Sequence, residues 1–177
     1  NQFPFKGFIM FIKFFVLIIL TLNASILFAE SNYEFQSELL FKHDQTISPG
    51  VIEAYSMQTN SEIKLFIGTF EKRSFWGQAI GLTSDELKNS FLEKAALYDS
   101  INRRSDRKVV SFKMTKDSQI VKILIQFSLK KNDLELIESN SYILTPNSSA
   151  FASALFPFGT PPLIQKEILK GIESFQF

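Results

Sequence analysis

The sequence predicts an α+β fold in which a mostly antiparallel sheet is packed against helices. Three observations support this class. Several segments alternate apolar and polar residues with period two, which is typical of half-buried strands. Short turn-forming stretches join these segments, as expected for antiparallel hairpins. One segment in mid-chain and one at the C-terminus instead carry apolar residues at helical spacing, which indicates helices laid on the sheet.

The N-terminal half is expected to contribute three strands. Residues 33–41 (YEFQSELLF) alternate well between apolar and polar side chains. Residues 44–50 end in a Pro-Gly pair and are predicted to turn. Segments 51–58 and 62–70 then form a hairpin around residues 59–61.

The C-terminal half is expected to contribute three more strands. Segments 109–114 and 119–130 are joined by a turn, and residues 134–144 form the hairpin partner of the second, with a bulge near residues 139–140. The segment 119–130 places five apolar residues on one face, which predicts a strand through the middle of the sheet: Val121, Ile123, Ile125, Phe127 and Leu129.

A helix is predicted over residues 84–101. Thr83 and Glu86 have the spacing of a capping box, in which each side chain accepts a hydrogen bond from the other residue's backbone amide. Leu82 and Leu87 stand where a hydrophobic staple would close over this cap. The apolar stripe continues at near-helical spacing through Phe91, Ala95 and Tyr98.

A second helix is predicted at the C-terminus, opening at Thr160-Pro161-Pro162. Proline suits the first helical turn, because the amide that it lacks has no partner there. One face of this helix carries Ile164, Ile168, Ile172 and Phe175.

Residues 1–29 are expected to be a signal peptide. Lys6 and Lys13 precede an apolar run from Phe14 to Leu22, which is about half of the roughly 20 residues that a membrane span needs. A start at Met10 would make residues 1–9 an upstream extension. Residues 30–177 are then one exported domain, periplasmic or extracellular, with no membrane span after cleavage. The alternative is an uncleaved leader that anchors the chain in a membrane.

Composition excludes several classes of function. The chain has no cysteine, so disulfides, thiol catalysis and thiolate metal sites are all excluded. Its 19 basic and 18 acidic residues nearly balance, which leaves no long-range positive field to attract nucleic acid. Of the 20 phenylalanines, 13 lie after residue 29, enough to supply an apolar core that needs no disulfides.

No catalytic, cofactor or metal site is predicted. His43 is the only histidine, and the His43-Asp44 pair lacks a recognisable nucleophile motif, so a histidine at a strand end is the favoured interpretation. A single histidine with scattered carboxylates gives no zinc or calcium pattern. Glycine-rich phosphate loops are also missing. We therefore expect a protein that is not an enzyme and needs no cofactor.

Three segments are candidate binding features. Arg103 and Arg104 open the run RRSDRK (103–108), which is either a solvated loop after the helix or a patch for an acidic partner. Trp76 either closes the core or contacts a ligand. The run AFASALFPFG (150–159) is either a short helix packed on the sheet or an exposed partner surface. Its candidate surface residues are Phe151, Leu155, Phe156 and Phe158.

The order of elements in the C-terminal part resembles the PsbP/DcrB-like superfamily. In that group a strand reading roughly "y-x-l-t" precedes a helix ending in "i-x-x-S-f". The matching residues here are Tyr142, Leu144 and Thr145, followed by Ile172, Ser174 and Phe175. The resemblance implies an α/β/α sandwich around an antiparallel sheet. It also implies an accessory or binding role, because the group contains extrinsic photosystem II proteins, periplasmic DcrB-like proteins and a Ran-binding import factor.

The leading functional hypothesis is therefore an exported, non-enzymatic accessory domain. It would bind an envelope protein or complex through a sheet edge or through residues 146–162. The main alternative is a carrier of a small apolar ligand in a phenylalanine-lined pocket. A third and weaker alternative is an enzyme whose acidic residues converge in a cleft.

Overall fold

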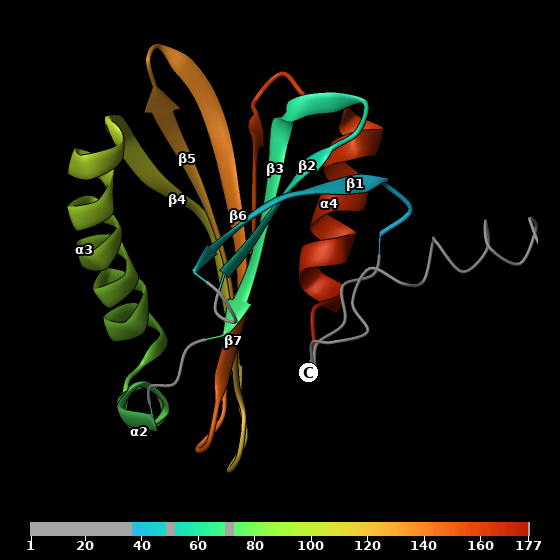
Figure 1. The fold of residues 1–177 in the computed structure, drawn as a ribbon. Helices are drawn as coiled ribbons and strands as arrows, with labels where there is room; N and C mark the ends of the chain where they lie inside the picture. Colours follow the sequence, from blue (N-terminus) through green and yellow to red (C-terminus); the bar gives the residue numbers. More distant parts are fainter. Residues whose placement is uncertain (1–36, 49–51, 70–72, 177) are drawn as a thin grey trace, which may run out of the picture. The chain divides into compact units, whose positions relative to one another are not determined.

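The structure is a computed structural model that describes residues 37–48, 52–69 and 73–176. The signal peptide predicted over residues 1–29 lies outside this range, as do residues 33–36 of the strand predicted over residues 33–41. The described residues form one seven-stranded sheet with helices on both faces (Figure 1). The predicted α+β class is confirmed.

All neighbouring strands in the sheet are antiparallel. The order across the sheet is β1-β2-β3-β7-β6-β5-β4, so β7 lies at the centre and β1 and β4 form the edges. The strands are β1 (Phe41–Ser48), β2 (Ile52–Met57), β3 (Asn60–Thr69), β4 (Arg104–Lys116), β5 (Val121–Lys131), β6 (Leu134–Leu144) and β7 (Ser149–Pro157).

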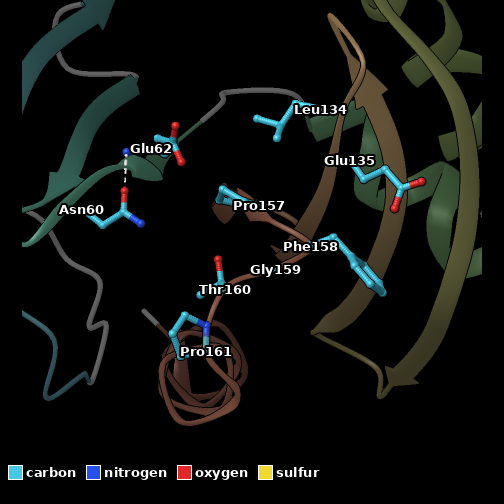
Figure 2. A pocket seen from close by; sticks show the side chains of 9 residues that line it. All are labelled: Asn60, Glu62, Leu134, Glu135, Pro157, Phe158, Gly159, Thr160 and Pro161. Carbon is cyan, nitrogen blue, oxygen red and sulfur yellow. Dashed lines mark hydrogen bonds between the residues drawn. The ribbon is translucent and has the colours of Figure 1, made fainter.

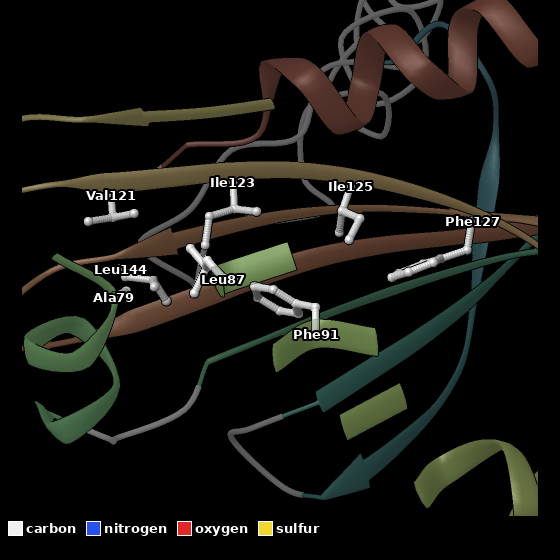
Figure 3. Packing of buried hydrophobic residues seen from close by; sticks show 8 residues of the cluster. All are labelled: Ala79, Leu87, Phe91, Val121, Ile123, Ile125, Phe127 and Leu144. Atoms are coloured by element: carbon white, nitrogen blue, oxygen red, sulfur yellow. The ribbon is translucent and has the colours of Figure 1, made fainter. Parts of the chain in front are cut away.

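One face of the sheet is covered by α2 (Arg73–Gly81) and α3 (Ser84–Asn102). The alternate apolar residues of β5 point to this face, where they pack against Leu87 and Phe91 of α3 (Figure 3). Burial of such a layer supplies most of the free energy that holds a helix to a sheet. The cluster consists of Ala79, Leu87, Phe91, Val121, Ile123, Ile125, Phe127 and Leu144.

The opposite face is covered by α4 (Pro162–Ser174), which contacts β6 and β7 (Figure 1). Small residues at alternate positions of β7 leave room for the helix: Ala150, Ala152 and Ala154 are all buried. Helix α4 contributes Ile168 and Ile172, which are also buried. The Lys122 side chain of β5 donates to the carbonyl oxygens of Glu173 (2.8 Å) and Phe175 (3.0 Å), so it caps the C-terminus of α4.

The best local signals of the sequence are confirmed. Both hydrogen bonds of the capping box are present at Thr83 and Glu86. The C-terminal helix begins with a proline in its first turn, as predicted. Strand β6 has the predicted bounds, and the hairpin formed by β2 and β3 lies where the sequence places it. Strand β5 is interior, although it is the second strand from an edge rather than the middle one.

Other predictions were wrong. Residues 149–157 form β7 rather than a short helix, because their alternate residues face opposite sides of the sheet. Residues 44–48 continue β1 instead of turning, whereas residues 37–40 lie outside any strand. The bulge expected at residues 139–140 is absent, since β5 and β6 pair in continuous register. Helix α2 was not predicted as a separate helix.

Within the described part of the chain, none of the helices combines the length and the hydropathy needed to cross a bilayer.

Candidate binding site at one end of the sheet

Three connections meet at one end of the sheet and form an open pocket of about 380 Å³. They are the β2–β3 turn, the β5–β6 turn and the loop between β7 and α4 (Figure 2). These connections meet because β3, β7, β6 and β5 are consecutive neighbours in the sheet. The hairpin-end pocket, as we call it, is lined by Asn60, Glu62, Leu134, Glu135, Pro157, Phe158, Gly159, Thr160 and Pro161.

Apolar side chains are unusually exposed at the hairpin-end pocket. Phe158 is 61% exposed and Leu134 is 46% exposed. Leu163, in the first turn of α4 directly after the loop, is 79% exposed. Single exposed apolar residues are ordinary on protein surfaces, but several beside a pocket mark an interaction site.

The loop that carries Phe158 is held in place on both sides. The Phe158 amide donates to the Glu135 carbonyl oxygen (2.9 Å), which extends the β6–β7 pairing by one residue. The Gln165 side-chain amide of α4 donates to the carbonyl oxygens of Phe158 (3.2 Å) and Thr160 (2.6 Å). Because Pro157 and Pro161 also restrict the backbone, the pocket is preorganised for binding.

The charges at the pocket are acidic. Glu62 and Glu135 are exposed, and neither has an ion pair with another described residue. The Asn60 side-chain oxygen accepts a hydrogen bond from the Glu62 amide (3.0 Å), which orients the turn at the pocket edge (Figure 2). None of the nine lining residues is basic.

The structure separates the four candidate residues of the 150–159 segment. Phe156 is fully buried beneath α4, so it belongs to the core and is not accessible to a partner. Phe151 and Leu155 are half-buried and point to the other face of the sheet. Only Phe158 lies at the hairpin-end pocket. Of the four, only Phe158 is both exposed and at the pocket, and burial removes only Phe156 from the predicted partner surface.

The segment 103–108 is not the solvated loop that its charge pattern predicts. Arg103 ends α3 in a left-handed conformation (φ 53°) and is exposed. Arg104 begins β4 and its guanidinium donates to Glu138 of β6 (2.9 Å). Arg104 pairs with Lys131 in the sheet, so both arginines lie at the same end as the β5–β6 turn. Strand β4 is separated from β7 by three strand spacings, about 14 Å. Neither arginine therefore lines the hairpin-end pocket.

The inward turn of this segment comes from a break in strand register. Pairing shifts between Ser105 and Lys108, and Asp106 takes a positive φ of 53° there. The shift directs Arg107 beneath α3, where its guanidinium donates to Asp99 (2.7 and 2.8 Å) and to Glu138 (3.1 Å). The same group lies 4.6 Å from the centre of the Phe127 ring.

The remaining candidates, His43, Asp44 and Trp76, lie away from the hairpin-end pocket lining. The Asp44 carboxylate accepts hydrogen bonds from Ser56 (2.6 Å) and Lys64 (2.7 Å), while the His43 ring packs edge-on against Tyr55 at 5.2 Å. Trp76 is half-buried and packs against the core cluster beneath α3, as the core interpretation expected. Among the described residues, no three histidine, aspartate or glutamate side chains are grouped closely enough to hold a metal ion.

Sequence reasoning missed most of the hairpin-end pocket. The turns at residues 59–61 and 131–133 were predicted, but nothing in the sequence indicates that they lie at the same end of the sheet as residues 157–161. That proximity depends on the pairing of β3 with β7, two strands that are far apart in the chain.

Comparison with known proteins identifies the fold. No family model matches the chain, and no curated protein matches it. Among solved structures, cyanobacterial PsbP (CyanoP) from Synechocystis is similar with a TM-score of 0.63 at 12% identity, covering 84% of this chain and 88% of that protein. A protein from Bacteroides thetaiotaomicron is similar with a TM-score of 0.50 at 12% identity, covering 81% of this chain and 44% of its own length. The chain therefore has a PsbP-like fold, which confirms the fold implied by the resemblance in its sequence.

Proposed function

We propose that this protein is an exported, non-enzymatic accessory domain that binds another protein of the cell envelope through the hairpin-end pocket. The observation that carries the proposal is Phe158, an aromatic side chain 61% exposed beside an open pocket. Aromatic residues next to well-formed pockets are frequent hot spots of protein interfaces.

The rigidity of the pocket supports binding as its role. Proline residues and the hydrogen bonds of Gln165 fix the loop before any partner arrives. Less conformational entropy is then lost on association, and more of the contact free energy contributes to affinity. An accessory role is also what the resemblance to the PsbP/DcrB-like superfamily implies. The export and envelope parts of the proposal rest on the leader pattern of residues 1–29.

Site-specific photo-crosslinking in the native host tests the proposal. A photoreactive amino acid replaces Phe158 in one variant of the full chain. In the matched control it replaces Asn147, an exposed residue in the β6–β7 turn at the opposite end of the sheet. We expect protein adducts of defined mass from position 158 that are absent from position 147. Equal adduct patterns at both positions, or none at position 158, would contradict binding through this pocket.

The same experiment distinguishes the carrier hypothesis. The hairpin-end pocket is open, and Phe158 is the single phenylalanine among its lining residues, so it does not enclose an apolar molecule as a carrier site would. Adducts of lipid mass at position 158, in place of protein adducts, would favour a carrier.

A further inference from the structure

We infer that the hairpin-end pocket binds a segment of a partner protein in which an apolar side chain is flanked by arginine or lysine. This inference rests on the proposed function and adds the chemistry of the partner. It follows from the combination of an apolar surface and acidic edges in one preorganised pocket.

The apolar part of the pocket determines the first feature of the partner. Leu134, Pro157, Phe158 and Pro161 supply its carbon surface. A volume of about 380 Å³ is near the lower end of the range for small-molecule sites, and the pocket is open to solvent. An open pocket of this size suits a large side chain presented by a larger molecule, whose neighbouring residues would cover Phe158.

The acidic edges determine the second feature. Glu62 lies near the start of β3 and Glu135 near the start of β6. Neither carboxylate forms an ion pair with a described cation. Lys130 faces Glu135 in the strand register, but its ammonium group instead pairs with Asp106 at 3.4 Å. A partner cation would therefore gain attraction at the pocket, whereas an anionic lipid surface or nucleic acid would be repelled.

The inference is tested by titrating the full chain with three blocked pentapeptides, followed by NMR or fluorescence anisotropy. The first peptide has phenylalanine at its centre, an arginine on each side and terminal glycines. The second replaces both arginines with glutamate, and the third replaces phenylalanine with alanine. We expect the first peptide to bind at least about fivefold more tightly than either of the others, with affinity falling as salt is raised.

Two sets of variants assign the binding to the pocket. The double variant Glu62→Gln/Glu135→Gln should weaken binding of the first peptide about fivefold and reduce its salt dependence, whereas Glu93→Gln on the exposed side of α3 should change neither. Phe158→Ala should weaken binding about 30-fold, as at an aromatic hot spot. Leu97→Ala, which removes an exposed apolar side chain of α3 that does not line the pocket, is the matched control.

The outcomes separate this inference from the proposed function. Equal binding of the glutamate peptide, or no effect of the double variant, would overturn the charge requirement. If Phe158→Ala still weakened peptide binding in that case, the proposal that the pocket binds a partner would stand. Phe158-dependent binding to vesicles of phosphatidylglycerol would also overturn the inference. If none of the peptides binds in a Phe158-dependent way, the inference fails, and the crosslinking experiment still decides the proposed function.

Discussion

At the scale of single residues, Arg107 carries a buried positive charge between two carboxylates. Its side chain is 7% exposed and lies between Asp99 of α3 and Glu138 of β6. Burial opposes its charge, but the hydrogen bonds that it donates to Asp99 and the charge of Glu138 outweigh that effect and raise the pKa of Arg107. Buried ion pairs add little net stability over apolar packing, so their main effect here is to fix α3 in one position.

Replacing Arg107 is expected to be costly because Asp99 would stay buried without a counter-charge, while Glu138 would keep only Arg104. We predict that Arg107→Met lowers the free energy of unfolding by about 3–5 kcal/mol, measured by urea denaturation. The control is Lys88→Met, which removes the partner of the solvent-exposed Asp85 in α3. Its free energy of unfolding should stay close to that of the parent chain.

The double replacement Asp99→Asn and Arg107→Met provides a second control. It removes the charge of Asp99 together with that of Arg107, leaves Glu138 paired with Arg104, and should recover much of the lost stability. A single Arg107→Met variant as stable as the parent chain would contradict the assigned role.

At the scale of elements, the edge strand β1 depends on side-chain contacts more than the inner strands do. Its pairing with β2 is interrupted by register shifts on both sides of Gln45 and Thr46. The Asp44 carboxylate compensates by accepting hydrogen bonds from Ser56 of β2 and Lys64 of β3. One side chain thereby ties three consecutive strands together.

This contact predicts acid sensitivity of the β1 edge. The hydrogen bond from Lys64, and then that from Ser56, lower the pKa of Asp44 from its ordinary value of 3.8. A lowered folded-state pKa means that the stabilisation is complete above about pH 4 and is lost as the pH falls through the folded value. We therefore expect Asp44→Asn to flatten the decline of stability between pH 5 and pH 2, measured by denaturant unfolding at each pH.

The variant Ser56→Ala tests the same contact without removing the carboxylate. It deletes the second hydrogen bond and should reduce the acid dependence only in part. If stability declined equally between pH 5 and pH 2 in the parent chain and in Asp44→Asn, the prediction would be contradicted.

At the scale of the described domain, one sheet supports two apolar layers. Leu87 of α3 is buried against one face and Ile168 of α4 is buried against the other. Strand β6 contributes buried residues to both layers, Leu144 to the first and Ile143 to the second, and β7 contributes Phe156 to the second. The loss of either layer would expose the same strands, so the layers should unfold together.

This arrangement predicts one cooperative transition. We expect Leu87→Ala and Ile168→Ala each to lower the free energy of unfolding by about 2–5 kcal/mol. Fluorescence of Trp76, the only tryptophan, should report the same midpoint as circular dichroism in both variants. Leu163→Ala, at an exposed position of α4, is the control with little effect. Separate midpoints from the two probes would show that the layers unfold independently.

The sequence predicted elements whose signals are local in the chain. The capping box of Thr83 and Glu86, the alternation of β5 and the proline start of α4 each depend on residues within a few positions of one another. Residues 149–157 were misjudged because apolar residues occupy both sets of alternate positions, so no polar face marks the segment as a strand. The Arg107 contacts were missed because a register shift turns a charged segment inward, and charge alone indicates a solvated loop.

By itself the sequence determined the α+β class, the hairpins, both principal helices and the exclusion of thiol chemistry. The tertiary structure alone decided that β3 pairs with β7, that Phe156 is buried while Phe158 is exposed, and that three separate connections form one open pocket with acidic edges. The physical reason is that hydrogen bonding within a helix or hairpin is local, whereas strand order depends on contacts between residues far apart in the chain. Those contacts determine which side chains lose their water and which remain available to a partner.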